Sequence, residues 1–436
     1  MSDYYCLPFS SHPLRDQLYD ELHARPFRAV TTPQQISHLA FKANPQELDR
    51  AFELVCELCQ RFAVEPPEEA TVSFWQDCGP FTIRWDRHME FYALTLARKG
   101  RGALFKQRVL DQVPENWLAS LPGQAVAALH LEVIEETADL NPTELEAAFE
   151  GQRLVLSEPK AGKALICSAF RLHSDGFGRI LIQNRGMDEC RMGRLVQRIY
   201  EMETYRLFAQ LAMPIAKRLA PELHEMDGQL AAMLARIPTT DTGNAERHLL
   251  ERLSLLSTRL ETWRAETNAR FSATWAYRDL VMSRLENIRE DKVEGHMTMA
   301  EFLSRRFNPG LRTCESVQNW LEDLSKRIER AGDLLRTRVN LTLQEQNKDL
   351  LATMNRRSDL QFRLQETVEG LSVAAISYYL IGLISYVLSG LPLDALELKK
   401  KVVIAWLVPL ILVTVWWGVK RIKDRLIKNP LGKSEV

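Results

Sequence analysis

The chain has 436 residues, of which 46% are hydrophobic and 26% are charged, and its net charge at pH 7 is −1. This length predicts two or three folding units, and the composition excludes a disordered or collagen-like chain. Nine Lys or Arg residues against four Asp or Glu residues lie between Gly370 and Val436, so the remaining chain is mildly acidic. We therefore expect no nucleic-acid partner, because such a partner requires a concentrated basic surface.

Seven cysteines, an odd number, are scattered along the chain. This usage indicates a reducing compartment instead of a disulfide framework. The first residues contain no apolar run of the length that a secretory signal peptide needs. We therefore expect the N-terminal body to remain in the cytoplasm.

Residues 1–186 are expected to form a cytoplasmic domain that mixes strands and helices. Its strand candidates share β-branched or aromatic residues and a rough alternation of apolar and polar positions. They are Ser37–Ala43, Thr71–Trp75, Phe81–Trp85, Phe91–Ala97, Ala127–Ile134, Leu154–Leu156, Lys163–Phe170 and Gly178–Gln183. Helices are predicted at Pro45–Phe62 and Pro142–Glu150, because each follows an Asn-Pro pair that suits a helix start.

The two helix starts resemble each other. Asn44–Phe52 and Asn141–Phe149 agree at six of nine positions, and a His-Leu pair that begins at His38 or His130 precedes each. The pattern predicts a duplicated strand–helix–strand–strand unit within one mixed sheet. Chance similarity is the alternative.

Ionisable side chains gather next to one strand candidate. Asp86, His88 and Glu90 alternate with other residues and would share one face of an extended segment. We interpret them as a solvated, salt-bridged sheet face, with a ligand patch as the alternative.

No motif for catalysis or metal binding is visible. Cys56 and Cys59 form a C-x-x-C inside a predicted helix, with no second pair or nearby histidine ligands to indicate zinc or redox chemistry. A Ser-His-Asp set and a phosphate-binding loop are also missing from the sequence. We expect no enzyme, no catalytic residue, no cofactor and no metal site.

A helical stalk is predicted over residues 187–369. Two apolar seams have heptad spacing. One runs through Leu249, Leu253, Leu256, Leu260 and Trp263, and the other through Val317, Leu321, Leu324, Ile328, Ala331 and Leu335. We expect a turn at Pro309-Gly310 to join their helices, which would pack antiparallel within one chain; packing between chains is the alternative. Since no further proline occurs before Pro392, the second helix should continue into the membrane.

Two uncharged runs predict a transmembrane hairpin, residues 370–393 and 402–419. A bilayer core requires about 20 helical residues, and lipid leaves no alternative to helices because it cannot satisfy a bare backbone. A short outer loop, residues 394–401, and a basic cytoplasmic tail, residues 420–436, complete the chain. A pair of buried soluble helices is the alternative.

The basic residues predict the orientation of this hairpin. Nine Lys or Arg residues flank its two ends, against three in its loop. The positive-inside rule then places both termini in the cytoplasm. We expect the lipid bilayer as a partner and the bacterial inner (plasma) membrane as the location.

A polar stripe with seven-residue spacing crosses the end of the stalk and the first span, at Gln365, Ser372, Tyr379 and Tyr386. Polar groups are unfavourable against lipid, so this stripe should face protein or water. A neighbouring line becomes small toward the outer end: Gln361, Val368, Ala375 and Gly382. We interpret the stripe as a helix-packing seam or, alternatively, as the wall of a pore that several copies of the first span form.

Four strings of residues, His23–Pro26, Phe170–Arg179, Glu203–Arg206 and Leu364–Tyr379, resemble an uncharacterised bacterial family of membrane-anchored proteins that is defined as a domain of unknown function. The resemblance runs over nearly the whole chain. It implies membrane anchoring and brings no activity.

The predicted architecture also resembles that of the CorA-type divalent-cation channels. That resemblance implies a homo-oligomer whose first spans line a pore. Ser385–Gly390 stands where that family carries Gly-Met-Asn, so the resemblance does not extend to the magnesium-selecting filter.

The sequence thus predicts an α+β cytoplasmic domain with a mixed sheet, a long α-helical stalk and a two-helix transmembrane hairpin, assembled as a homo-oligomer. The first of two predicted functions is that of an ion channel or transporter. The alternative is a non-conducting, membrane-anchored scaffold or sensor whose cytoplasmic domain binds a protein partner or a small ligand.

Overall fold

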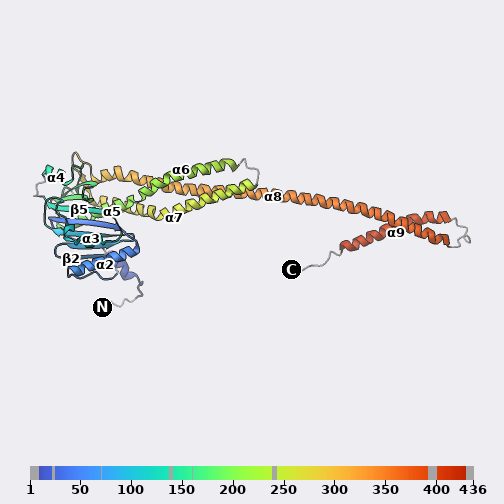
Figure 1. Cartoon of the computed structure of the whole chain (residues 1–436), viewed down its shortest axis with the longest axis horizontal. Helices are drawn as coiled ribbons and strands as arrows, with labels where there is room; N and C mark the ends of the chain where they lie inside the picture. The colour runs from blue at the N-terminus through green and yellow to red at the C-terminus, as the bar shows by residue number, and fades with distance from the viewer. Residues whose placement is uncertain are drawn as a thin grey trace. The chain divides into compact units, whose positions relative to one another are not determined.

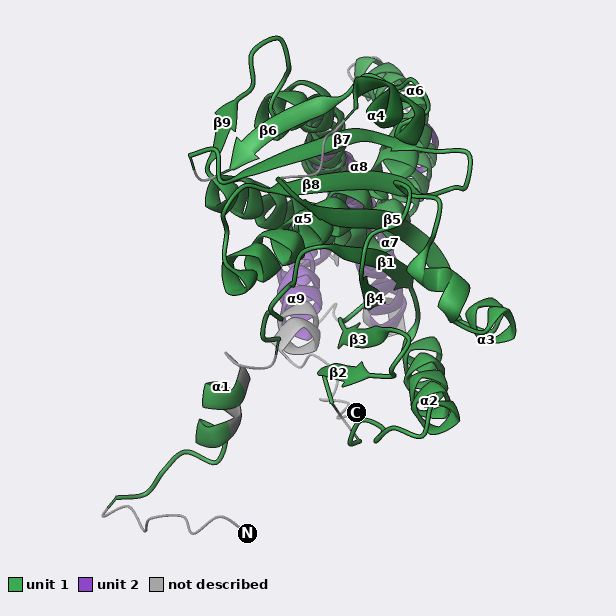
Figure 2. Cartoon of the chain, turned by 90° about the vertical axis from the view of Figure 1, so that its left-hand side faces the viewer, with its two compact units in different colours: residues 1–240, 248–332 green, residues 241–247, 333–436 purple. Residues whose placement is uncertain are grey.

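The computed structural model describes residues 9–21, 25–69, 71–136, 141–159, 161–237, 243–390 and 400–428. The chain divides into two compact units, residues 1–240 with 248–332 and residues 241–247 with 333–436 (Figure 2). Most of the predicted outer loop, residues 394–399, and the end of the basic tail, residues 429–436, lie outside the described residues.

Nine strands of the described residues form one mixed sheet in the first unit, in the order β2-β3-β4-β1-β5-β8-β7-β6-β9. Their bounds are β1 Gln34–Lys42, β2 Ser73–Asp77, β3 Thr82–Arg87, β4 Phe91–Lys99, β5 Gln124–Glu135, β6 Val155–Pro159, β7 Ala164–Leu172, β8 Gly178–Asn184 and β9 Glu290–Lys292. All eight predicted strands are therefore present. Strand β9, which pairs with β6 and forms one edge of the sheet, was not predicted.

The strand order repeats across the middle of the sheet. From the β1–β5 pair outward, one half reads β1-β4-β3-β2 and the other β5-β8-β7-β6. The directions do not repeat, because β1 and β4 are antiparallel whereas β5 and β8 are parallel. The two halves share an order of elements and differ in one strand direction, so they are not superposable copies.

Helices cover both faces of the sheet (Figures 1 and 2). On one face, Ile36 and Ala40 of β1 join a core with α5, α7 and α8; on the other, Leu39 joins a core with α2 and α3. This alternation along β1 is the two-residue period of a strand that is buried on both faces. The helices of the sheet domain are α1 Arg15–Glu21, α2 Pro45–Arg61, α3 Glu115–Ala119, α4 Pro142–Ala148 and α5 Glu189–Gln210, with a 3₁₀ turn η1 at Val109–Gln112.

The predicted Asn-Pro helix starts are confirmed. The Asn44 side chain accepts the Glu47 backbone N–H at 2.9 Å, and the Glu47 carboxylate accepts the Asn44 N–H at 2.8 Å. The Asn141 side chain likewise accepts the Thr143 N–H at 3.0 Å. These contacts satisfy backbone donors that the first helical turn leaves free.

Three long helices follow the sheet domain in the chain: α6 Ala212–Arg236, α7 Gly243–Ile288 and α8 Met299–Gly390. Within the first unit, α6, α7 and the first part of α8 lie side by side (Figure 1). Both predicted heptad seams are buried, and α6 adds a third apolar face through Leu219, Leu223 and Leu230. Arg259 of α7 pairs with Glu222 of α6 at 3.1 Å. The antiparallel packing within one chain therefore includes one helix more than predicted.

The predicted turn at Pro309-Gly310 is wrong, because α8 runs through both residues. The reversal lies earlier, where β9 follows α7 and Thr298 caps α8: its hydroxyl accepts the Glu301 N–H at 3.0 Å. Pro309 removes one helical hydrogen bond, and its exposed position lets water satisfy the freed carbonyl.

In the second unit, α9 Lys400–Lys428 lies along the C-terminal part of α8 (Figure 1). The α9 residues that turn toward α8 recur every three or four positions, as in Ile404, Leu407, Ile411 and Val415. Ile411 is 6% exposed and Ser377 of α8 is 2% exposed. These residues define the helix–helix contact of the hairpin.

Candidate functional site

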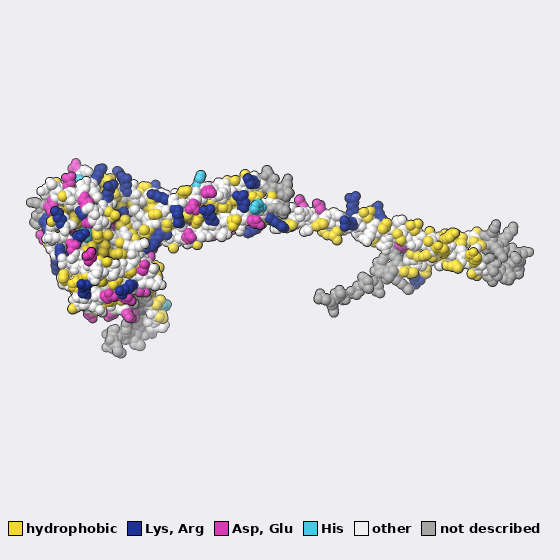
Figure 3. Space-filling model, viewed as in Figure 1, with side chains coloured by type: hydrophobic (Ala, Val, Ile, Leu, Met, Phe, Trp, Pro, Cys, Tyr) yellow, Lys and Arg dark blue, Asp and Glu magenta, His cyan; other side chains and the backbone are white. Residues whose placement is uncertain are grey.

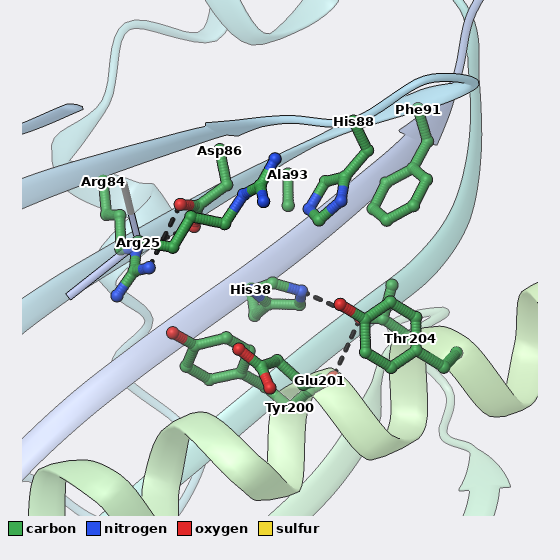
Figure 4. Close-up of a pocket in the computed structure, with 11 residues that line it drawn as sticks. Arg25, His38, Arg84, Asp86, His88, Phe91, Ala93, Tyr200, Glu201 and Thr204 are labelled. Atoms are coloured by element: carbon green, nitrogen blue, oxygen red, sulfur yellow. Dashed lines mark hydrogen bonds and ion pairs between the residues drawn. The ribbon is translucent and has the colours of Figure 1, made fainter. Parts of the chain in front are cut away.

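A polar cavity lies between strands β1, β3 and β4 and helix α5, with Arg25 at its edge (Figure 4). Its volume is about 20 Å³, enough for roughly one water molecule. Several ionisable groups converge on it from segments that are far apart in sequence.

An ion pair between Arg84 and Asp86 lies at this cavity. The Arg84 Nε and Nη2 atoms donate to the Asp86 carboxylate at 2.7 and 3.1 Å, and the two side chains are 8% and 7% exposed. The Ser73 hydroxyl donates to Asp86 at 2.6 Å, and Arg84 also donates to the Pro26 carbonyl at 3.0 Å. The pair is thus buried, so the prediction of a solvated sheet face is wrong here.

The His38 ring is held at both nitrogens (Figure 4). Its Nδ1 lies 2.8 Å from the Thr95 hydroxyl and its Nε2 lies 2.9 Å from the Thr204 hydroxyl. Because the Thr204 hydroxyl donates to the Tyr200 carbonyl at 2.8 Å, it accepts from His38, and the ring proton sits on Nε2. The ring also stacks on Tyr200, with centroids 4.4 Å apart.

Burial lowers the pKa of His38 to about 3, so the imidazole is neutral at physiological pH. A ring that is neutral and bonded at both nitrogens has no free lone pair to bind a metal or take a proton from a substrate. His38 therefore serves as a structural link between the sheet and α5.

The other two predicted face residues lie in the turn after β3. The His88 ring stacks on Phe91 with centroids 4.0 Å apart, and burial, followed by the charge of Arg25, lowers its pKa to about 4. Glu90 pairs with Arg270 and accepts the Tyr277 hydroxyl at 2.7 Å. The side chains of Asp86 and His88 thus both line the cavity, whereas the Glu90 carboxylate bonds to side chains of α7.

The His38, Arg84 and Asp86 side chains at this cavity are hydrogen-bonded to neighbouring groups, so together they form a polar network within the fold. Within the described ranges, no group of three or more His, Cys, Asp or Glu side chains is placed to hold a metal ion. Burial also raises the pKa of the Cys59 thiol to about 12. Such a thiol is a poor nucleophile.

A larger cavity of about 400 Å³ adjoins the polar network and shares Arg84 and Tyr200 with it. Thr31 and Gln34 are among the lining residues, and within the described part of the chain their buried Oγ1 and Oε1 atoms have no hydrogen-bond partner. The Arg28 guanidinium lies over the Trp75 ring at 4.6 Å. A cavity of this size, lined by polar, charged and apolar side chains, can accept a small ligand.

The sequence-predicted stripe lies on α8 in the second unit. Gln365, Ser372, Tyr379 and Tyr386 are all exposed, Tyr379 by 72% and Tyr386 by 83%. Ser377 faces α9, and Tyr379 is two residues further on, about 200° around the helix. The stripe therefore lies on the side of α8 that α9 does not cover.

Two helices of the described residues are long and apolar enough to cross a membrane, within Met299–Val387 and within Ile404–Ile422. Figure 3 shows hydrophobic side chains gathered over the C-terminal part of α8 and over α9. This surface is consistent with two membrane-spanning helices, by length and composition.

A family model described as a protein of unknown function (DUF3422) matches residues 10–426. Among solved structures, the chain is similar to the full-length CmaX protein, at 13% identity and a TM-score of 0.19, over 69% of this chain and 94% of that one. No inference follows from a TM-score of this size. A search of curated proteins finds no match.

Proposed function

Since the chain belongs to the DUF3422 family, whose description carries no activity, we propose a function from the molecule itself. The chain forms a homo-oligomer in a membrane, in which the first spans of several copies meet and line a path for ions. One surface of α8 carries this proposal.

That surface, the open face of α8, is the side opposite α9. It holds Leu343, Leu350, Met354, Gln361, Gln365, Val368, Ser372, Ala375, Tyr379, Gly382 and Tyr386. All its side chains are exposed, and a Cβ added at Gly382 would meet nothing within 4 Å.

The polarity of the open face is the reverse of what a single copy needs. Before the apolar run, where the helix would be in water, it presents Leu343, Leu350 and Met354, exposed by 44%, 61% and 64%. Within the apolar run it presents Ser372 and Tyr379. A lone hairpin would leave these apolar groups in water and the Tyr379 hydroxyl against lipid, whereas the Ser372 hydroxyl donates to the Val368 carbonyl at 2.8 Å.

Association of several copies through the open face resolves both mismatches. Burying a leucine or methionine side chain stabilises by about 1.5–3 kcal/mol, and each copy offers three. Small residues such as Ala375 and Gly382 allow close approach of helices in a membrane. Hydroxyl and amide groups then face neighbouring copies or water instead of lipid.

The path for ions follows from the polar members of this face. Rings of Gln365 amides and of Ser372, Tyr379 and Tyr386 hydroxyls would offer neutral oxygen atoms, which can replace part of the hydration shell of an ion. This arrangement supports conduction without the Gly-Met-Asn filter.

The orientation proposed for the hairpin has both termini in the cytoplasm and the inner membrane of a bacterium as its location. Lys420 lies over the Trp416 ring at 4.8 Å and Arg421 over the Trp417 ring at 4.7 Å. Aromatic rings beside cations are typical of the headgroup region. A reporter that is fused at Val436 and active only outside the cytoplasm would contradict this orientation.

The mass of the detergent-solubilised protein tests the assembly. The wild type should be larger than a dimer, and Leu350→Asp combined with Met354→Asp should reduce it to monomers. Leu341→Asp is the matched control, because Leu341 is 57% exposed on the opposite side of α8. A monomeric or dimeric wild type would refute the pore.

Ion flux into liposomes tests conduction. Ser372→Leu should reduce flux at least tenfold, because it replaces a hydroxyl of the path with a bulky apolar group. Val413→Leu, on the outer side of α9 and 64% exposed, should leave flux unchanged. A stable oligomer without flux would leave the second candidate function.

That second candidate is a non-conducting, membrane-anchored scaffold or sensor. The cavity of about 400 Å³, whose lining includes Arg28, Gln34 and Arg84, favours it. Binding of a small ligand there should raise the unfolding temperature of the wild type and fail to do so for Gln34→Leu.

A further inference from the structure

A second large cavity, of about 490 Å³, lies in the first unit between three segments. The β6–β7 region contributes Arg153 and Arg171, α5 contributes Arg206, and the beginning of α8 contributes Arg306. It shares no lining residue with the His38 network.

The charges at this cavity have one sign. Four guanidinium groups line it, and no Asp or Glu does. Within the described ranges, no ion pair or hydrogen bond joins the side chain of Arg153, Arg171 or Arg306 to a partner. Arg153, Arg171 and Arg306 are exposed side chains in its wall. Like charges that line one cavity without a carboxylate beside them favour an anion.

The fourth arginine is held in place by a buried acid. Arg206 meets the Glu203 carboxylate in three contacts of 3.2, 3.1 and 2.6 Å, and Glu203 is 3% exposed. Arg206 also lies over the Phe170 ring at 5.7 Å, and that ring stacks on Phe302 with centroids 4.8 Å apart. These contacts fix the orientation of Arg206, while within the described residues no acidic side chain pairs with the other three arginines.

A neighbouring cavity of about 340 Å³ shares Phe170, Arg171 and Arg206. The carboxylate that lines it, Glu203, is the one already bonded to Arg206. The two cavities together exceed the size of a single inorganic phosphate and have the volume of a drug-sized ligand.

We propose that this arginine cavity, defined by Arg153, Arg171, Arg206 and Arg306, binds a phosphate-bearing ligand with at least two negative charges. Guanidinium groups match phosphate oxygens in a planar, bidentate fork. The three unpaired arginines supply the charge that such a ligand requires. This site is independent of the membrane assembly proposed above.

The test uses the full-length protein in detergent and calorimetric titration with ATP and with inorganic pyrophosphate. A second arm measures binding to vesicles that contain phosphatidylglycerol, compared with vesicles of phosphatidylcholine alone. Wild-type protein should bind a soluble phosphate compound in the first arm if the ligand is free, or the anionic vesicles in the second if the ligand is a lipid headgroup.

Arg171→Ala and Arg306→Ala should each weaken binding at least tenfold, and affinity should fall with salt concentration. Arg305→Ala is the matched control, because Arg305 is exposed on the same helix, carries the same charge and does not line the cavity. Far-UV circular dichroism and the unfolding temperature establish that each variant is folded.

Two results would overturn the proposal. One is that neither phosphate compounds nor anionic vesicles bind. The other is that Arg305→Ala weakens binding as much as Arg306→Ala, because general surface charge would then explain the affinity. Neither result depends on oligomer mass or ion flux.

Discussion

Acid should destabilise the sheet domain through its buried histidines. Burial lowers the pKa of His38 to about 3 and the pKa values of His88 and His130 to about 4, from an ordinary value of 6.5. Below pH 6.5 the unfolded chain therefore binds protons that the folded protein does not. The stability that these three neutral histidines contribute is fully present above pH 6.5. It is lost as the pH falls toward their pKa values in the folded protein.

The magnitude follows from about 1.36 kcal/mol per pH unit for each group. At pH 5, which is 1.5 units below the unfolded pKa of 6.5, each histidine lowers the free energy of unfolding by about 2 kcal/mol, or about 6 kcal/mol for the three. Ordinary carboxyl groups titrate mostly below this window.

Urea unfolding of the full chain in detergent, followed by tryptophan fluorescence at pH 7.5 and pH 5, measures this loss. His38→Gln should reduce the difference between the two pH values by about 2 kcal/mol. His248→Gln is the matched control, since the His248 side chain is 76% exposed on α7. If His38→Gln and the wild type lose the same stability, the folded protein protonates His38 and the reasoning from burial is refuted.

Two further substitutions test the packing of the sheet domain. Asp86→Asn should lower the free energy of unfolding by about 3–5 kcal/mol, because it leaves the Arg84 charge buried without its partner. The double variant Asp86→Asn with Arg84→Met should recover much of this loss. A loss below about 1 kcal/mol for Asp86→Asn alone would contradict the buried ion pair. Gly193→Ala should cost about 1–3 kcal/mol, because its Cβ would lie 1.8 Å from the Arg28 carbonyl oxygen. Gly228→Ala, with nothing within 4 Å, should instead raise helix stability by about 0.5–1 kcal/mol, so equal effects would exclude the clash.

Most secondary structure was predictable because its signals are local. The alternation along the strands and the Asn-Pro starts of α2 and α4 identified those elements to within a few residues. The heptad positions of α7 and α8 identified the buried seams in the same way. Each signal depends on residues that are neighbours in the chain.

The errors arose where a local rule competed with packing. Pro309 suggested a turn, yet the buried neighbours Phe307 and Leu311 keep α8 continuous around it. The true start of α8 has a sequence signal, since Thr298 and Glu301 have the spacing of a capping box. The three residues of β9 have no comparable pattern, and their pairing with β6 depends on the fold.

The two apolar runs near the C-terminus and the stripe on the first of them were determined by the sequence alone, because hydropathy and helical spacing are properties of consecutive residues. Only the tertiary structure decided which side chains meet. His38 bonds Thr204 across 166 positions, and the arginine cavity draws on three separate segments. The spacing of residues likewise shows which side chains share one face of α8, but it does not show which face α9 covers. That depends on how the two helices pack.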